Sequence, residues 1–144
     1  MIGSQRFATI VTCIDGRIQR PLEEWAIRHL DVDYLDTITE PGPAAVLTAT
    51  GESHLTAVLA KVAVSQRAHG SGTLVIVGHA DCAGNPVSAD EHRDQLRRSV
   101  ARLARRLPDT RILAVHADQC GERCWDPELV AEVSPTAVGP DLVF

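Results

Sequence analysis

The chain alternates short apolar segments with longer segments of helical periodicity, and this alternation restricts its possible folds more than any other feature. The apolar segments 6–14, 32–39, 73–79 and 111–117 are rich in β-branched residues, and we predict a strand in each. Strands that alternate with crossover helices form mostly parallel sheets, because the crossover connection has a strongly preferred right hand. The sequence therefore predicts an α/β fold with a mostly parallel central sheet of about four to five strands, covered by helices.

Three helices are expected in the connections between these strands. Pro21 suits the first turn of a helix, and the apolar residues after it recur at helical spacing as far as Leu30. A second helix is expected to end near Gly70, because glycine favours helix C-termini. A third is expected to begin at Ser88, which has Glu91 at the spacing of a capping box.

The remaining segments are expected to lack long regular elements. Residues 41–43 read Pro-Gly-Pro, which excludes a continued strand or helix in the sequence interpretation. Prolines interrupt the carboxyl-terminal segment 118–144, which we expect to be irregular or to form a short hairpin. A chain of 144 residues can bury roughly two-thirds of its unfolded surface. We therefore expect one domain over residues 1–144, with its core at about 6–117.

The charge and hydropathy of the chain argue against two classes of partner. The formal net charge is −5, so the chain lacks the overall positive field that attracts nucleic acid or anionic lipid. No segment approaches the roughly 20 apolar residues needed to span a bilayer, and the amino terminus lacks the pattern of a signal peptide. We expect a cytoplasmic protein with no nucleic-acid or membrane partner.

Two predicted strands end in residues that can bind metal or transfer protons. Open parallel sheets bind ligands beyond the carboxyl ends of their strands, at the point where the strand order reverses. At the first strand end, Cys13, Asp15 and Arg17 would share one side of an extended segment. At the third, His79 and Cys82 have a spacing that lets both reach one ion. The two strand ends together offer two sulfur ligands and one nitrogen ligand.

Two thiolates and one imidazole form a ligand set that zinc accepts. With Cys13, His79 and Cys82 as ligands, the fourth tetrahedral position is available to water or to the Asp15 carboxylate. Water in that position implies catalysis, whereas Asp15 as the fourth ligand implies a closed structural site. Arg17 can influence this choice by pairing with the carboxylate. Taken alone, Cys13 also fits a small buried hydrophobic residue and His79 a polar loop residue.

Other residues near these motifs have more ordinary interpretations. Asp81, between His79 and Cys82, is expected to form a turn rather than to act as a base. His116, Cys120 and Cys124 form a second cluster, for which an accessory metal or a redox pair is an alternative to loop cysteines without a partner. We favour unpartnered loop cysteines.

The pattern "C-x-D-x-R" at 13–17, followed by "H-x-x-C" at 79–82, resembles the zinc and dyad signature of the β-carbonic anhydrases. The similarity extends from about residue 7 to about residue 117. It implies zinc (Zn²⁺) on Cys13, His79 and Cys82, with Asp15 and Arg17 as the dyad that orients water or closes the site. The family hydrates carbon dioxide reversibly to bicarbonate. Its members are usually dimers or multiples of dimers, so the resemblance implies a homodimer or a multiple of dimers here.

The sequence departs from the family pattern at several positions. Gly16 replaces the usual serine within the dyad motif, and "TEPGPAAV" at 39–46 replaces an "R-N-A-G" stretch. Ala83 stands where a glycine usually follows the second zinc cysteine. These differences leave two alternatives to a carbonic anhydrase that acts on carbon dioxide and bicarbonate. One is a carbonyl sulfide or carbon disulfide hydrolase of the same superfamily, and the other is a non-catalytic zinc-binding module with Asp15 on the metal.

Overall fold

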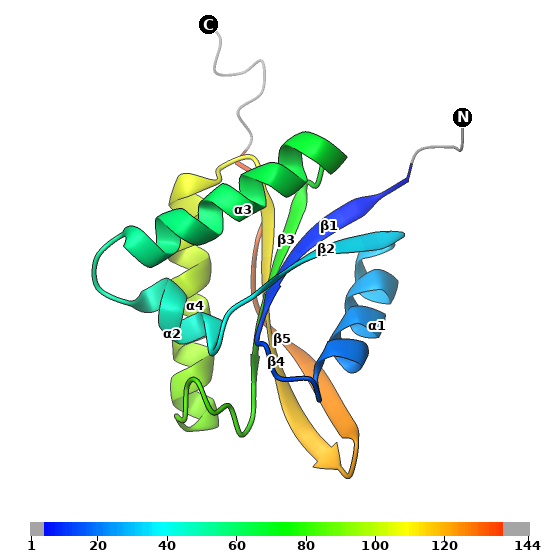
Figure 1. Cartoon of the computed structure of the whole chain (residues 1–144), viewed down its shortest axis with the longest axis vertical. Coiled ribbons are helices and arrows are strands. Elements are labelled where there is room, and N and C mark those ends of the chain that lie inside the picture. Colours follow the sequence, from blue (N-terminus) through cyan, green and yellow to red (C-terminus); the bar gives the residue numbers. More distant parts are fainter. Residues whose placement is uncertain (1–4, 137–144) are drawn as a thin grey trace, which may run out of the picture.

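A computed structural model of the chain describes residues 5–136, which are organised around one five-stranded sheet (Figure 1). Its elements in chain order are β1 (Phe7–Thr12), α1 (Gln19–Leu30), β2 (Tyr34–Thr39), α2 (Pro43–Thr48), α3 (Ser53–His69), β3 (Thr73–His79), α4 (Ala89–Arg106), β4 (Arg111–Gly121) and β5 (Cys124–Val133).

The sheet has the strand order β2-β1-β3-β4-β5, in which only β5 runs antiparallel to its neighbour. The predicted α/β fold with a mostly parallel sheet is therefore confirmed. The chain moves from β1 to β2 on one side and then returns to place β3 on the other side of β1, so the strand order reverses between β1 and β3. Val11 lies beside Ile76 in this pair, one residue before the end of β1 and three residues before the end of β3.

Helices cover both faces of the sheet (Figure 1). Side chains alternate across each strand, so Val11 and Ile76 face the layer of α2, α3 and α4, whereas Ile10 and Val75 face α1. Leu22 of α1 packs in the second of these two buried clusters. That cluster also contains Cys13 and Cys82, so the two predicted sulfur ligands lie in the hydrophobic layer between α1 and the sheet.

The predicted helix ends agree with the structure at two positions. Gly70 ends α3 in the left-handed conformation with φ of 65°, which glycine adopts without steric cost. The Ser88 hydroxyl accepts a hydrogen bond from the Glu91 backbone N–H at 3.1 Å and so caps α4.

The Pro-Gly-Pro segment is more regular than the sequence interpretation allowed. Pro43 opens α2, a helix of six residues that the prediction missed. Proline tolerates the first helical position because the N–H that it lacks would have no intrahelical partner there. The preceding Gly42 has φ of 66°, and this turn directs the chain from β2 into α2.

The carboxyl-terminal region also differs from the expectation of an irregular segment or a short hairpin. The strand predicted at 111–117 continues to Gly121, and it pairs over most of its length with β5. The resulting hairpin is long, and it extends beyond the other strands (Figure 1). Residues 137–144 of the predicted segment 118–144 lie outside the described part of the chain. None of the described helices is long and apolar enough to cross a bilayer.

Candidate metal centre

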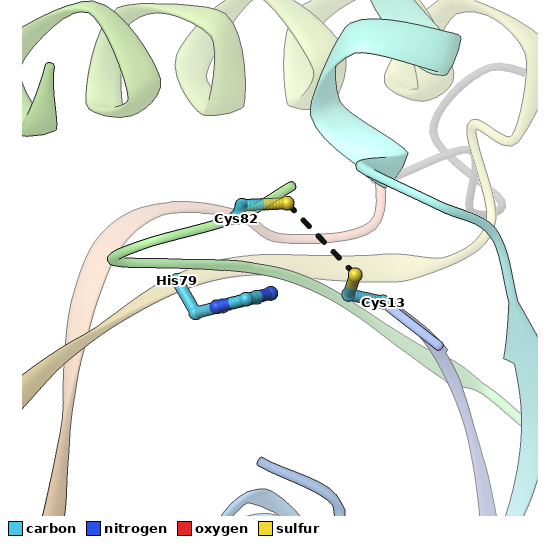
Figure 2. Close-up of side chains that lie close together, drawn as sticks. All are labelled: Cys13, His79 and Cys82. Carbon is cyan, nitrogen blue, oxygen red and sulfur yellow. Dashed lines mark hydrogen bonds between the residues drawn. The ribbon is translucent and has the colours of Figure 1, made fainter. Parts of the chain in front are cut away.

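Three predicted ligands meet where β1 and β3 end (Figure 2). Cys13 directly follows β1, His79 is the last residue of β3, and Cys82 lies in the next loop. One ligand atom from each of the three lies within 4.8 Å of the others. All three residues are buried, with exposed fractions of 4% or less. Side chains 69 positions apart therefore form one compact group because β1 and β3 are adjacent parallel strands.

The separation of the two sulfur atoms fits a tetrahedral metal. The Sγ atoms of Cys13 and Cys82 are 3.9 Å apart (Figure 2). Two zinc–sulfur bonds of about 2.3 Å at a tetrahedral angle place their sulfur atoms about 3.8 Å apart. The donor set and its spacing therefore fit zinc without rearrangement of the two thiols.

A backbone contact leaves one nitrogen of His79 available as a ligand. Nδ1 of His79 lies 2.8 Å from the carbonyl oxygen of Ala80, where it donates its proton. Nε2 is then the unprotonated nitrogen, and it is buried with no hydrogen-bond partner. A buried polar atom without a partner is costly, and a bound metal ion removes that cost.

Without a bound metal, the surroundings of Cys82 oppose the ionisation of its thiol. Burial raises its pKa, and the nearby Cys13 raises it further. Zinc binds thiolates, so its binding to this site requires the release of protons.

Asp15 and Arg17 form a close ion pair beside the ligand group. Nη2 of Arg17 is 2.7 Å from Oδ2 of Asp15, and Nε lies 3.1 Å and 3.2 Å from the two carboxylate oxygens. The hydrogen bond from Arg17 lowers the pKa of Asp15 to about 2, although partial burial opposes the shift. Asp15 is therefore ionised at neutral pH.

The reason that these two side chains meet differs from the one predicted. Strand β1 ends at Thr12, so residues 13–18 are not extended and their side chains do not alternate. The backbone N–H of Arg17 instead donates to Oδ1 of Asp15 at 2.9 Å, which closes a tight turn. The Gln19 amide, which the sequence analysis did not single out, donates to the carbonyl oxygens of Cys13 and Asp15.

Asp81 has a contact that the sequence interpretation did not include. It adopts the left-handed conformation with φ of 55°, as suits a turn-forming aspartate. Its Oδ2 lies 3.2 Å from Nη1 of Arg17, and its carbonyl oxygen accepts a hydrogen bond from Nη2 at 3.2 Å. The loop between His79 and Cys82 thus contacts Arg17 directly.

Trp125 of β5 also reaches the site, and no sequence motif marked it. Its ring lies under the Arg17 guanidinium, with 5.4 Å between the guanidinium carbon and the ring centroid. The same ring meets the His79 imidazole edge to face, at 5.8 Å between centroids. Trp125 is 8% exposed.

A cleft of about 1050 Å³ opens beside Trp125, between the start of α1 and the β4–β5 hairpin. Its walls include Arg17, Arg20 and Arg123.

The loop after Cys82 packs against the Pro-Gly-Pro segment. A Cβ atom on Gly84 would lie 2.6 Å from the carbonyl carbon of Pro41, and one on Gly42 would lie 2.7 Å from the carbonyl carbon of Gly84. Only glycine allows the two backbones to approach so closely. The segment that replaces the "R-N-A-G" stretch thus contacts the metal-ligand loop, and Gly84 has a packing role one position after Ala83.

The second predicted cluster does not form a metal site or leave its cysteines unpartnered. Cys120 and Cys124 are joined by a disulfide across the tip of the β4–β5 hairpin, which corrects the expectation of loop cysteines without a partner. His116 is fully buried on β4 and its ring packs against that of His92, at 5.0 Å between centroids. Within residues 5–136, the three-ligand group of Cys13, His79 and Cys82 includes none of these side chains.

The sequence of this chain matches a known protein family. A family model described as "Putative carbonic anhydrase" matches residues 3–131, which is most of the chain. The chain belongs to this family. The resemblance to the β-carbonic anhydrases drawn from the two sequence motifs is confirmed, and the chain is a divergent member of that group.

One solved structure supports the same fold. A tetrameric β-carbonic anhydrase from the filamentous ascomycete Sordaria macrospora has a TM-score of 0.57 and 12% identity, with 92% of this chain and 85% of that chain covered. The β-carbonic anhydrase CafA of Aspergillus fumigatus has a TM-score of 0.44 and 15% identity, covering 90% of this chain and 78% of that one. No curated protein sequence matches the chain. At such low identity the Sordaria structure supports the shared fold, and the site must be argued from this chain's own residues.

Proposed function

We propose that this chain is a zinc-dependent lyase that hydrates carbon dioxide reversibly to bicarbonate. The observation that carries the proposal is the buried group of Cys13, His79 and Cys82, whose ligand atoms lie within 4.8 Å of one another. The family match and the adjacent ion pair of Asp15 and Arg17 support it. In this proposal the three residues hold the metal, and the two charged residues form the catalytic dyad.

Zinc, when bound, lowers the pKa of a coordinated water to about 7 and so supplies a nucleophile at neutral pH. The chain's own contribution is to hold this water and to receive its hydrogen bond. Asp15 suits that role because its pKa of about 2 keeps the carboxylate ionised and able only to accept. The Arg17 guanidinium contacts both carboxylate oxygens, which favours an Asp15 that is directed toward Arg17 rather than toward the metal.

The assembly and location of the protein are further parts of the proposal. We propose a single domain that acts as a homodimer or a multiple of dimers, with small molecules as its substrates; the tetrameric Sordaria enzyme supports an oligomer. We also propose a cytoplasmic location. The cytosol keeps exposed thiols reduced, so the thiol state of Cys120 and Cys124 in rapidly quenched cells tests that location.

Stopped-flow measurement of carbon dioxide hydration tests the activity. The protein is first shown to hold one zinc per chain, and Asp15→Asn serves as the matched variant. We expect a clear rate for the native chain at pH 7 to 8 and a loss of about 100-fold or more in the variant, with zinc retained. A native chain without activity, or a variant with full activity, would contradict the proposed reaction or the proposed dyad respectively.

An altered segment motivates a second candidate substrate. The Pro-Gly-Pro segment replaces the usual family stretch and packs directly on Gly84, in the loop that follows Cys82. Hydrolysis of carbonyl sulfide or carbon disulfide needs a similarly activated water. Release of hydrogen sulfide by a zinc-loaded chain that lacks carbon dioxide hydration would favour this alternative. Absence of both activities, together with a carboxylate ligand in the zinc X-ray absorption spectrum, would favour a binding module closed by Asp15.

A further inference from the structure

We propose that Trp125 and Asp81 are positioning residues that together hold Arg17 against Asp15. The Arg17 guanidinium lies over the Trp125 ring, and Asp81 contacts its two terminal nitrogens. The arrangement itself is independent of the reaction, whereas its consequence for turnover rests on the proposed hydration function. Neither residue belongs to the signature that identified the site.

The position of Arg17 needs an explanation, because its own segment does not fix it. Arg17 lies in a turn beyond the end of β1, and its side chain is 46% exposed. A long side chain in such a place loses considerable rotamer freedom when it adopts a single conformation. A bond to Asp15, only two residues away, does not by itself hold the pair in place, because both partners belong to the same turn. Contacts from other elements are therefore needed to hold the pair in one place.

Trp125 supplies a rigid contact from the opposite end of the chain. Its ring is 8% exposed and lies 5.4 Å from the guanidinium carbon, within the range of a cation–π interaction. The ring also packs against His79, at 5.8 Å between centroids. Trp125 pairs with Gln119 in the hairpin, and the Cys120–Cys124 disulfide lies directly beside this pair. The pairing of β5 with β4 thus presents the aromatic face.

Asp81 contributes through both its side chain and its backbone. The exposed side-chain ion pair at 3.2 Å contributes little by itself, because Asp81 is 77% exposed. The carbonyl oxygen of the same residue accepts a second hydrogen bond from Nη2, and the left-handed conformation of Asp81 orients this carbonyl. Asp81 is adjacent to Cys82, so the position of Arg17 depends on the loop that carries the metal ligand.

This arrangement has a direct consequence for Asp15. The Arg17 side chain makes three contacts to the Asp15 carboxylate, and its remaining contacts are to Trp125 and Asp81. If these outer contacts are lost, Arg17 gains conformational freedom and Asp15 loses its fixed partner. The carboxylate is then free to turn toward other positions, including the metal. The two positioning residues therefore favour the open form of the site.

The test measures the order of Arg17 in the full chain loaded with zinc. Hydrogen exchange of the Arg17 Nε–H, followed by nitrogen-15 NMR, reports whether the guanidinium stays bound. We expect exchange about fivefold faster in Trp125→Leu and a smaller increase in Trp125→Phe, which retains an aromatic face. Asp81→Asn, which keeps the turn preference, should give a smaller increase than Asp81→Ala, which loses both the charge and that preference.

Trp25→Leu is the matched control, because Trp25 stacks on His29 within α1 rather than on Arg17. It should leave the exchange rate of Arg17 unchanged. Unchanged exchange in Trp125→Leu and in both Asp81 variants would overturn the inference, even if the native chain hydrates carbon dioxide. Loss of zinc from Trp125→Leu with normal Arg17 exchange would also overturn it, since Trp125 would then act through His79. If Trp125→Leu does not fold, the Asp81 variants at an exposed position decide the question.

Turnover separates this inference from the proposed function. If the native chain is active, Trp125→Leu should lower kcat about fivefold with little change in KM, in parallel with the faster exchange of Arg17. A fall in kcat without any change at Arg17 would contradict the positioning role. If the native chain is inactive, the exchange experiment still tests the positioning role, while the proposed function fails separately.

Discussion

Two regions of this chain carry similar residues and reach different outcomes. Cys13 and Cys82 are buried with His79 at the ends of β1 and β3, and their sulfur atoms lie 3.9 Å apart without a covalent bond. Cys120 and Cys124 lie at an exposed hairpin tip and form a disulfide, while the nearby His116 points into the core. The comparison shows that the three side chains able to bind a metal converge from separate elements in this chain. At the hairpin, His116, Cys120 and Cys124 are close together in sequence, but their side chains do not form such a group.

The largest predicted effect separates the two cysteine pairs by zinc content. Cys82→Ser should lower zinc affinity by more than the roughly 10–100-fold that loss of an outer hydrogen-bond partner costs, because a direct ligand is removed. Cys124→Ser should retain one zinc per chain, because its sulfur lies outside the ligand group. Metal analysis after dialysis against a weak chelator measures both. Equal zinc loss in the two variants would contradict the distinction between the regions.

A second prediction concerns the buried histidines that do not belong to the metal group. Burial lowers the pKa of His92 to about 4, and the neighbouring His116, whose own pKa is lowered by burial, adds to this shift. Between about pH 4 and the unfolded value of 6.5, the unfolded chain binds more protons than the folded chain at His92. The stabilising effect of a neutral His92 is thus complete above pH 6.5 and is lost as the pH falls toward 4.

Urea unfolding of the native chain and of His92→Gln at pH 7.5 and pH 5 measures this effect. His92 should account for about 2 kcal/mol of the loss in unfolding free energy at pH 5, and the variant should lack that part. Comparing the two proteins at each pH removes the common contribution of metal binding. An identical pH dependence in both would show that the pKa of His92 is the same in the folded and unfolded chain, contrary to the effect expected from its burial.

A third prediction concerns the effect of the hairpin disulfide on stability. A cross-link that closes so short a loop stabilises a chain by about 2 kcal/mol in the chain-entropy model. Reduction of Cys120–Cys124 should therefore lower Tm by a few degrees and leave bound zinc in place. A non-metal-binding reductant such as a phosphine suits the experiment, with Cys124→Ser as the unresponsive control. Zinc release on reduction would show that the two regions are not independent.

The sequence predicted the fold class because its main signal is local. Apolar runs of strand length and stripes of helical period recur within a few residues, and they fix which segments become strands and helices. The ends of α3 and α4 at Gly70 and Ser88 were predictable for the same reason. Helix α2 was missed because Pro43, taken as a break, also suits the first position of a helix.

The ligand group was predictable, but parts of its surroundings were not. Cys13, His79 and Cys82 follow strands whose neighbouring positions can be inferred from the topology of open sheets. The meeting of Asp15 and Arg17 was predicted from alternation, whereas a turn brings it about. No local pattern places Trp125 beside Arg17, because that contact depends on the length of a hairpin more than 100 residues further along the chain.

The sequence by itself determined the α/β fold class, the presence of the metal-binding residue types and their placement at two strand ends. These follow from periodicity and side-chain chemistry, which are properties of short segments. Only the tertiary structure decided that Cys120 pairs with Cys124, that His116 packs on His92, and that Trp125 and Asp81 both contact Arg17. Each of these contacts depends on strand register, turn conformation or hairpin length, which are set when distant segments pack together.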